Sequence, residues 1–400
     1  MTILRLSVAL FLLQAGFHAY TASLPLALAR AGAPDASIGL IMGVAAVVQI
    51  PGAIAGGRLL DAFGGARLFI IAGLAYVAAA AILLLPGTDP AAGLAPFVVA
   101  RVLQGAGLGL ALPAALSMVP RLVPAMRQAA SLAYIGAAHN VALMIMPALS
   151  IAIMNSSSLR GVDVLVVGMV LAGLLLSRRL PTRDPEPSGT TGMAAASRRF
   201  GITYRREWTA PLVIVVLYVA HWGVVTSYLP IRAEAAGADI GLFFAADGIS
   251  IVAMRLVTGS LVGRFSLRLL ILVGAGMTAA SLGLLLLPLT TPILLLCGLL
   301  GGTGGAIVMT PITIELSRRS ADADRGSAFA LFSGGLAAAM TIGSIGGAPI
   351  VALFGMGTGL VAGIAMILVA MVLTAVNRPL AEPVLTGAEP VVVPVQAEVP

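Results

Sequence analysis

Apolar segments of about 20 residues recur along the whole chain, and the short stretches between them hold most of the charged residues. A helix of this length crosses a hydrocarbon core of about 30 Å. Of the 400 residues, 59% are hydrophobic and 10% are charged, whereas about a quarter of the residues in a soluble domain are charged. The alternating pattern of a membrane barrel is absent. The sequence therefore predicts an all-α integral membrane protein.

Twelve such segments can be counted, six on each side of one long polar stretch. They are 5–29, 38–57, 67–87, 95–118, 128–153, 161–179, 210–231, 240–259, 268–288, 292–315, 327–353 and 357–376. Residues 181–208 are rich in Pro, Ser, Thr and Gly, which is typical of a flexible linker. We therefore expect an N-terminal half (1–180), a linker (181–208), a C-terminal half (209–376) and a disordered tail (377–400).

The arginines are distributed unevenly between the ends of these segments. All 23 basic residues are arginine, and eighteen of them fall on one side if the termini share that side with the 181–208 stretch. Only Arg30, Arg160 and Arg232 then fall on the other side. Cytoplasmic loops carry an excess of Lys and Arg, so we expect a cell inner membrane protein with both termini in the cytoplasm. The net charge of +7 then reflects topology, and we expect no nucleic-acid partner.

The two sets of six segments resemble each other. TASLPLALARAGA (21–33) matches TSYLPIRAEAAGA (226–238) at a spacing of 205 residues. This match argues against the alternative that the first segment is a cleaved signal peptide, because a cleaved peptide has no reason to resemble an internal helix. The stretch GGRLLDAFGGAR (56–67) recurs in degraded form as GSLVGRFSLR (259–268). Two six-span halves with a site between them are typical of a transporter.

The stretch GRLLDAFG (57–64) resembles the G-x-L-x-D-x-x-G signature of the major facilitator superfamily, at the turn between the second and third spans. Gly57 allows two helices to approach closely and Gly64 allows a tight turn. The resemblance implies that Asp61 latches the two halves together on the cytoplasmic side. The basic residues that the family has after the aspartate are absent here, and we expect Arg67 to compensate in part.

Two further segments carry the resemblance. RVLQGAGLG (101–109) resembles the family's R-x-x-Q-G-x-G segment in span four. GAAHNVALMIMPALS (136–150) is similar to the glycine-proline segment of drug/proton antiporters in span five, except that Met146 replaces the glycine before Pro147. The chain is also similar to a bacterial group called arabinose-efflux-permease-like. The resemblance covers residues 5 to 376 and implies the major facilitator fold.

Few ionisable residues fall inside the predicted spans, and a charged side chain there costs about 3 kcal/mol or more. They are Arg101, Asp247, Arg255, His18, His139 and His221. The family resemblance places spans one, four, seven and ten around a central cavity. We therefore expect a substrate cavity lined by Gln14, His18, Gln104, His221 and Trp222. Each histidine could instead be a neutral ring bonded to a carbonyl, and each arginine a structural tether or, for Arg255, a snorkelling side chain.

Depth along the helices motivates a proton-coupling site. Span eight enters from the outside near residue 240 and span five from the cytoplasm near residue 128, so Asp247 and His139 reach similar levels. In the family these spans face each other across the interface between halves. We expect His139 and Asp247 to approach each other when the outside is closed, with Arg101 as the third member of the coupling site.

These features favour a secondary active transporter that exports a small organic compound by alternating access, coupled to protons, in the lipid bilayer and as a monomer. An alternative is a transition-metal or metal-chelate transporter, suggested by the three histidines and by Met144 and Met146 near His139. Another is a proton-coupled uptake porter for a sugar or organic acid. An enzyme is not expected, because the sequence holds no H-E-x-x-H and no pair of membrane aspartates. We expect no cofactor and no resident metal.

Overall fold

The structure is a computed structural model, which describes residues 2–88, 93–178, 204–262, 264–321 and 324–377. The first half holds α1 (Thr2–His18), α2 (Tyr20–Arg30), α3 (Asp35–Phe63), α4 (Gly65–Leu84), α5 (Ala95–Leu122), α6 (Ala125–Ser156) and α7 (Leu159–Ser177). The second half holds η1 (Arg206–Trp208), α9 (Thr209–Ala235), α10 (Ile240–Val262), α11 (Leu267–Leu284), α12 (Thr291–Arg318), α13 (Arg325–Thr341), η2 (Ile342–Gly346), α14 (Ala348–Phe354) and α15 (Met356–Val376).

The prediction of an all-α membrane protein is confirmed. Within the described ranges, eleven helical segments are long and apolar enough to cross a membrane, with α1 and α2 counted as one span and α13 to α14 as another. The remaining long helix, α10, has 23 residues and stands where the eighth span is expected. Most of the predicted 181–208 linker and all of the predicted tail except Asn377 lie outside the described residues.

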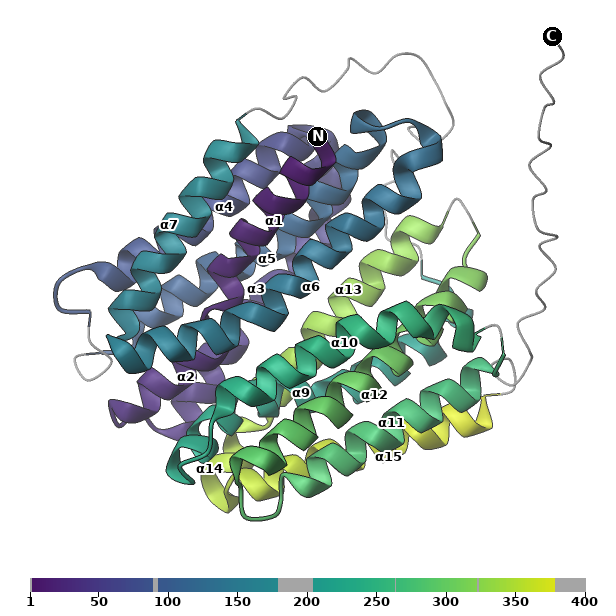
Figure 1. The fold of residues 1–400 in the computed structure, drawn as a ribbon. Coiled ribbons are helices and arrows are strands. Elements are labelled where there is room, and N and C mark those ends of the chain that lie inside the picture. Colours follow the sequence, from purple (N-terminus) through teal and green to yellow (C-terminus); the bar gives the residue numbers. More distant parts are fainter. Residues whose placement is uncertain (1, 89–92, 179–203, 263, 322–323, 378–400) are drawn as a thin grey trace, which may run out of the picture.

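The helices form two groups that repeat one packing pattern (Figure 1). In the first half α5 packs against α3 and α4, and α1 packs against α6 and α7. In the second half α12 packs against α10 and α11, and α9 packs against α13 and α15 in the same way. The halves meet through two equivalent pairs, α6 with α10 and α3 with α13, and through α2 with α9. The pseudo-symmetry expected from the sequence repeat is therefore present in the fold.

Two predicted spans are interrupted, which the hydropathy pattern does not reveal. Span one changes from α1 to α2 at Ala19, whose carbonyl accepts a hydrogen bond from Ser23 Oγ at 2.7 Å. Span eleven contains the π-helical segment η2, in which Gly347 N donates to Ile342 O at 3.1 Å. Pro349 follows and has no N–H to continue the regular ladder. Single π turns of this kind loosen a helix locally.

The contact between α3 and the second half is a seam of small residues. A Cβ added to Gly39 would stand 2.6 Å from Ser344 O, and one added to Gly43 would stand 2.4 Å from Ile345 Cγ1. Glycine is therefore required at both positions for α3 to approach η2 this closely. We call this contact, formed by Gly39, Gly43, Ser344 and Ile345, the glycine seam.

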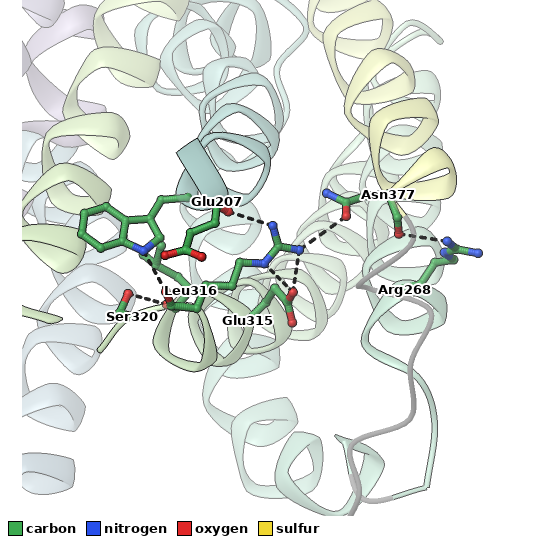
Figure 2. Close-up of polar contacts among 8 residues, drawn as sticks. Glu207, Arg268, Glu315, Leu316, Ser320 and Asn377 are labelled. Atoms are coloured by element: carbon green, nitrogen blue, oxygen red, sulfur yellow. Dashed lines mark hydrogen bonds and ion pairs between the residues drawn. The ribbon is translucent and has the colours of Figure 1, made fainter. Parts of the chain in front are cut away.

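The bundle has two ends, which we name by the segments found there. The linker face is the end where α1 begins, α7 ends, α9 begins and α15 ends, and the far face is the opposite end (Figure 1). At the linker face, a polar network around Arg319 joins η1, α11, α12 and the end of α15 (Figure 2). Arg319 bonds Glu315 Oε1 at 2.7 Å and Glu207 O at 2.8 Å, and its carbonyl accepts from Trp208 Nε1 at 3.1 Å. Asn377 O accepts from Arg268 at 2.9 Å. This network fixes the beginning of α9 against the ends of α12 and α15.

Candidate functional site

A cavity of about 220 Å³ lies inside the second half and contains the one carboxylate predicted in the middle of a span there. Its wall is formed mainly by α9, α10, α11 and α12, with Leu143 of α6 contributed by the first half. The polar and aromatic lining residues are Tyr218, His221, Trp222, Phe243, Asp247, Thr278 and Ser281. His221 and Trp222, expected in the substrate cavity, and Asp247, expected in the proton-coupling site, thus line one cavity in this structure.

Glycines of α12 determine where Asp247 sits. A Cβ added to Gly302 would stand 2.2 Å from the Asp247 carbonyl oxygen, and one added to Gly298 would stand 2.4 Å from Phe243 O. Gly298 and Gly302, one turn apart on α12, are thus the surface on which α10 rests, while Gly304 packs on Gly274 of α11. Gly301 is different, because a Cβ there would meet only side-chain atoms, Ser281 Oγ at 3.3 Å and Asp247 Oδ1 at 3.7 Å. A side chain at residue 301 would therefore project into the cavity against Asp247 and Ser281.

Most of the polar groups around this cavity already have partners. Tyr218 Oη and Thr278 Oγ1 share a hydrogen bond of 2.8 Å, and Ser281 Oγ donates to Cys297 O at 2.8 Å. His221 Nδ1 lies 2.5 Å from Tyr218 O. Asp247 is 4% exposed, and no hydrogen bond or ion pair links its carboxylate to another described residue. Among the described residues that line the cavity, Asp247 is the only charged side chain, and it has no cationic partner there.

A second polar cluster lies inside the first half and centres on Arg101. The side chain is 3% exposed, donates to Gln104 Oε1 at 2.8 Å and to Met42 O at 2.9 Å, and stacks on the Phe17 ring at 4.8 Å. Tyr76 Oη donates to Gln14 Oε1 at 3.5 Å. No carboxylate forms an ion pair with Arg101 among the described residues. The guanidinium is therefore a buried charge held by neutral groups and an aromatic face.

The predicted cavity residues of the first half face this cluster. Gln14 and Gln104 are fully buried within the first half, and neither they nor His18 line the cavity of the second half. The His18 ring lies 5.3 Å from the His139 ring. The amide nitrogens of both glutamines, both ring nitrogens of His18, Arg101 Nε and His139 Nδ1 have no hydrogen-bond partner within the described part of the chain. The cluster therefore presents unused donors.

The predicted contact between His139 and Asp247 is not formed in this structure. His139 pairs with His18, while Asp247 faces the cavity. The two helices do touch next to these residues, because Gly248 of α10 abuts the Met144 side chain of α6. Met144 lies five residues, more than one helical turn, along α6 from His139, so Asp247 and His139 meet different neighbours.

Two buried carboxylates are missed in the sequence-based selection. Asp163 in α7 is 1% exposed and accepts from Tyr20 Oη at 2.5 Å, which links α7 to α2. Glu315 in α12 is 3% exposed and pairs with Arg319. Asp163 lies only five residues from the start of α7 and Glu315 at the last residue of a predicted span, so both pass for interfacial residues. The signal that could have identified them is that both carboxylates fall inside predicted spans, 161–179 for Asp163 and 292–315 for Glu315.

The predicted latch lies at the linker end of α3. Gly57 and Asp61 fall within α3, and their side-chain surroundings lie outside the described residues. Gly64 has φ 75° and connects α3 to α4, as a tight turn requires. Arg67 begins α4 with an exposed side chain. Gly105 and Gly107 of the second signature pack on the Ala45 backbone and on Tyr76, respectively.

Polar contacts hold the two halves together at the far face. Arg30 of α2 bonds Glu234 Oε1 of α9 at 2.7 Å and Asn155 Oδ1 of α6 at 3.0 Å. Tyr228 Oη of α9 donates to Asp35 O at the start of α3 at 3.1 Å. The two halves are thus closed upon each other at this face.

We expect Glu234→Gln to weaken closure of the far face with little loss of stability, because an exposed ion pair contributes only about 0.2–1 kcal/mol. Spin labels on Ser158→Cys and Ala236→Cys, one in each half, should show a distance distribution shifted toward longer values. Glu207→Gln removes the same charge at the linker face, where only the Glu207 backbone carbonyl bonds Arg319, and should leave the distribution unchanged. An unaltered distribution in Glu234→Gln would show that the ion pair does not control closure.

Comparison with known proteins agrees with this architecture. The chain matches the model of the Major Facilitator Superfamily over residues 6–290 and 233–397. An uncharacterized MFS-type transporter of Mycobacterium tuberculosis (strain ATCC 25618 / H37Rv) is 34% identical over 125 residues, which is 30% of this chain and 21% of that protein. The match thus spans about a fifth of the length of this relative.

Solved transporter structures share the fold. A peptide transporter, POT, in complex with sulfate has a TM-score of 0.74 at 15% identity and covers 95% of each chain. The nucleoside transporter NupG has a TM-score of 0.73 at 11% identity, covering 96% of this chain and 100% of its own. A D-xylose-proton symporter has a TM-score of 0.73 at 20% identity, covering 93% and 96%. From its repeated six-helix halves and the extent of the family match, the chain is a multi-pass membrane protein of the Major Facilitator Superfamily, a family of transporters rather than enzymes.

Proposed function

We propose that the protein is a proton-coupled secondary transporter that exports a small organic compound by alternating access. The observation that carries this proposal is Asp247, a buried carboxylate that faces a cavity and has no cationic partner among the described residues. A group of this kind can bind and release a proton without breaking a structural ion pair. The likeness of residues 136–150 to the glycine-proline segment of drug/proton antiporters supports export over uptake.

The coupling route in this proposal runs from Asp247 toward the first half. Leu143 lines the cavity and lies one helical turn from His139, which pairs with His18. His139 and Arg101 are therefore proposed as further members of the coupling site. The unused donors around Arg101 would find partners at another stage of the cycle, because buried donors rarely remain unsatisfied in every state.

A metal cargo has less support from the side chains. In the described ranges, no three His, Cys, Asp or Glu side chains converge on a point that could hold an ion. The His18 and His139 rings form a pair, but both ring nitrogens of His18 and Nδ1 of His139 have no hydrogen-bond partner among the described residues. The organic substrate is therefore the better-supported proposal.

The proposed orientation places the linker face in the cytoplasm of a cell whose inner membrane holds the protein as a monomer. Eighteen of the 23 arginines then lie on the cytoplasmic side. In this orientation the far face is the outer face, and it is the closed one. Gly57, Asp61, Gly64 and Arg67 would act as a latch that forms when the linker face closes.

The orientation can be tested by labelling cysteines from outside sealed, right-side-out cells. Ala236→Cys at the far face is expected to react with an impermeant maleimide, whereas Thr190→Cys in the linker is expected to react only after the cells are opened. Cys297→Ala provides the background, since Cys297 is buried. Labelling of Thr190→Cys in sealed cells would reverse the orientation.

The transport function is tested with the purified protein in liposomes under an imposed pH gradient. A panel of organic cations, anions, sugars and neutral compounds is applied, and the accumulation of each is compared with and without the gradient. Gradient-dependent movement of at least one compound is the expected result. Accumulation that is driven by Na⁺ and not by the pH gradient would contradict proton coupling.

A further inference from the structure

We propose that the cavity of the second half binds a small organic cation with an aromatic or apolar body, and that such cations are the substrate class of the transporter. The role in transport rests on the proposed function. Binding itself rests on the chemistry of the cavity and can be tested alone.

The charge of the cavity selects for a cation. Asp247 is 4% exposed and its carboxylate has no cationic partner within the described part of the chain. No arginine lines the cavity, and the Tyr218, Thr278 and Ser281 hydroxyl groups are engaged with one another or with a backbone carbonyl. Leaving one buried carboxylate uncompensated is costly, so a bound cation would stabilise the site.

The histidine adds an acceptor. Because the Tyr218 carbonyl can only accept a hydrogen bond, His221 Nδ1 carries the hydrogen in their 2.5 Å contact. The neutral ring is then left with Nε2 as an acceptor. The titratable groups facing the cavity are Asp247 from α10, and His221 and Tyr218 from α9, while the lining residues from α6, α11, α12 and α13 do not titrate as acids or bases. The free groups therefore suit an ammonium ion.

Two aromatic rings that line the same cavity as the Asp247 carboxylate would also contribute to binding a cation. Trp222 and Phe243 are stacked with ring centres 6.4 Å apart and an interplanar angle of 27°. Phe243 lies one helical turn before Asp247 on α10, and both line the cavity. A cation over an aromatic face gains about 0.5–2 kcal/mol, more when it is desolvated. The Asp247 carboxylate and the two aromatic rings thus both favour a positively charged ligand.

The size of the cavity limits the ligand. Drug-sized ligands occupy pockets of about 300–1,000 Å³, whereas this cavity measures about 220 Å³. Residue 301 is glycine, and an added Cβ would take up cavity space 3.3 Å from Ser281 Oγ and 3.7 Å from Asp247 Oδ1. A compound with a single aromatic ring and a short ammonium arm therefore fits better than a polycyclic dye.

Competition between a proton and the organic cation for Asp247 would couple the movement of one to the movement of the other. A proton on Asp247 removes the charge that holds the cation, and a bound cation opposes protonation. The two ligands exclude each other, and mutual exclusion at one site converts an inward proton gradient into outward movement of the cation.

Calorimetric titration of the full-length protein in detergent tests the binding. Phenethylamine, which is cationic at neutral pH, is compared with its neutral isostere 2-phenylethanol and with the anion 3-phenylpropanoate. We expect the amine to bind at least about tenfold more tightly than the alcohol, the anion not to bind, and affinity for the amine to fall as the pH is lowered. Asp247→Asn should remove the preference for the amine, and Asp247→Glu should retain it.

The cavity is tested by a matched pair of glycine variants. Gly301→Ala places a methyl group beside Asp247 and should weaken amine binding about tenfold, whereas Gly276→Ala on α11, where an added Cβ meets nothing within 4 Å, should not. Equal affinity for amine and alcohol, or amine binding unchanged in both Asp247→Asn and Gly301→Ala, would overturn the inference. Asp247-dependent amine binding without pH-driven transport would uphold this site and refute the proposed function. Proton-coupled transport of a neutral or anionic compound, without amine binding, would uphold the proposed function and refute the amine site.

Discussion

The Asp247→Asn protein should fold and, at substrate concentrations high enough to offset weaker binding of a cation, exchange substrate downhill, but it should lose accumulation driven by a pH gradient. Asparagine has nearly the same shape as aspartate, and no ion pair or hydrogen bond to a described residue is lost with the carboxylate. The amide cannot bind and release a proton, so the coupling step has no carrier. Liposomes with substrate on both sides measure exchange, and liposomes with an imposed gradient measure accumulation. We expect accumulation to fall to the background of protein-free liposomes.

Two further variants test whether proton coupling depends on Asp247 itself or on any buried carboxylate. Asp247→Glu keeps the titratable group in a cavity with room for one more methylene and should recover part of the accumulation. Asp163→Asn changes the carboxylate that accepts from Tyr20 in the first half; it should reduce thermal stability and leave coupling intact. Full accumulation by Asp247→Asn would remove Asp247 from the coupling mechanism.

Gly302→Val should prevent the second half from folding. An added Cβ would stand 2.2 Å from the Asp247 carbonyl oxygen and 2.9 Å from its carbonyl carbon, and both are backbone atoms that cannot rotate away. The α10 and α12 helices would have to separate along their whole contact, and we expect a cost above the roughly 1–3 kcal/mol of ordinary overpacking. The measurement is the yield of monodisperse protein and its melting temperature in detergent.

Gly276→Val is the matched control for this prediction. Both glycines lie within helices of the second half, and an added Cβ at Gly276 meets no atom within 4 Å. The same loss of backbone freedom and the same change of helix propensity accompany both substitutions. If the two variants were equally stable, close backbone approach of α10 and α12 would not be what holds Asp247 in place.

The helices can be predicted from the sequence because the lipid bilayer restricts which segments can cross it. Each span must be apolar and helical, so length and hydropathy locate the helices. Hydropathy does not locate the change from α1 to α2 at Ala19 or the π-helical segment Ile342–Gly346, because neither feature changes how apolar its span is. Gly298 and Gly302 form a packing surface of the kind that small residues in spans provide.

The candidate site is predictable only in part. Asp247, His221 and Trp222 stand out by residue type and share one cavity. The pairing of His139 with His18 instead of Asp247 was not predicted, because depth along a helix gives the level of a residue but not the direction of its side chain. The contribution of α11 through Thr278 and Ser281 depends on tertiary packing, which no local pattern specifies.

The glycine seam has a mechanical consequence for the cycle. Side chains that interlock across an interface resist sliding, because each must leave its hole before the next position is reached. At Gly39 and Gly43 the surface of α3 has no side chains, and it faces the backbone and short side chain of Ser344 and the side chain of Ile345. Few side chains at the glycine seam would therefore oppose a small rotation of one half against the other, and the two halves would stay in van der Waals contact during it. The adjoining π turn would let the opposing helix flex without breaking that contact.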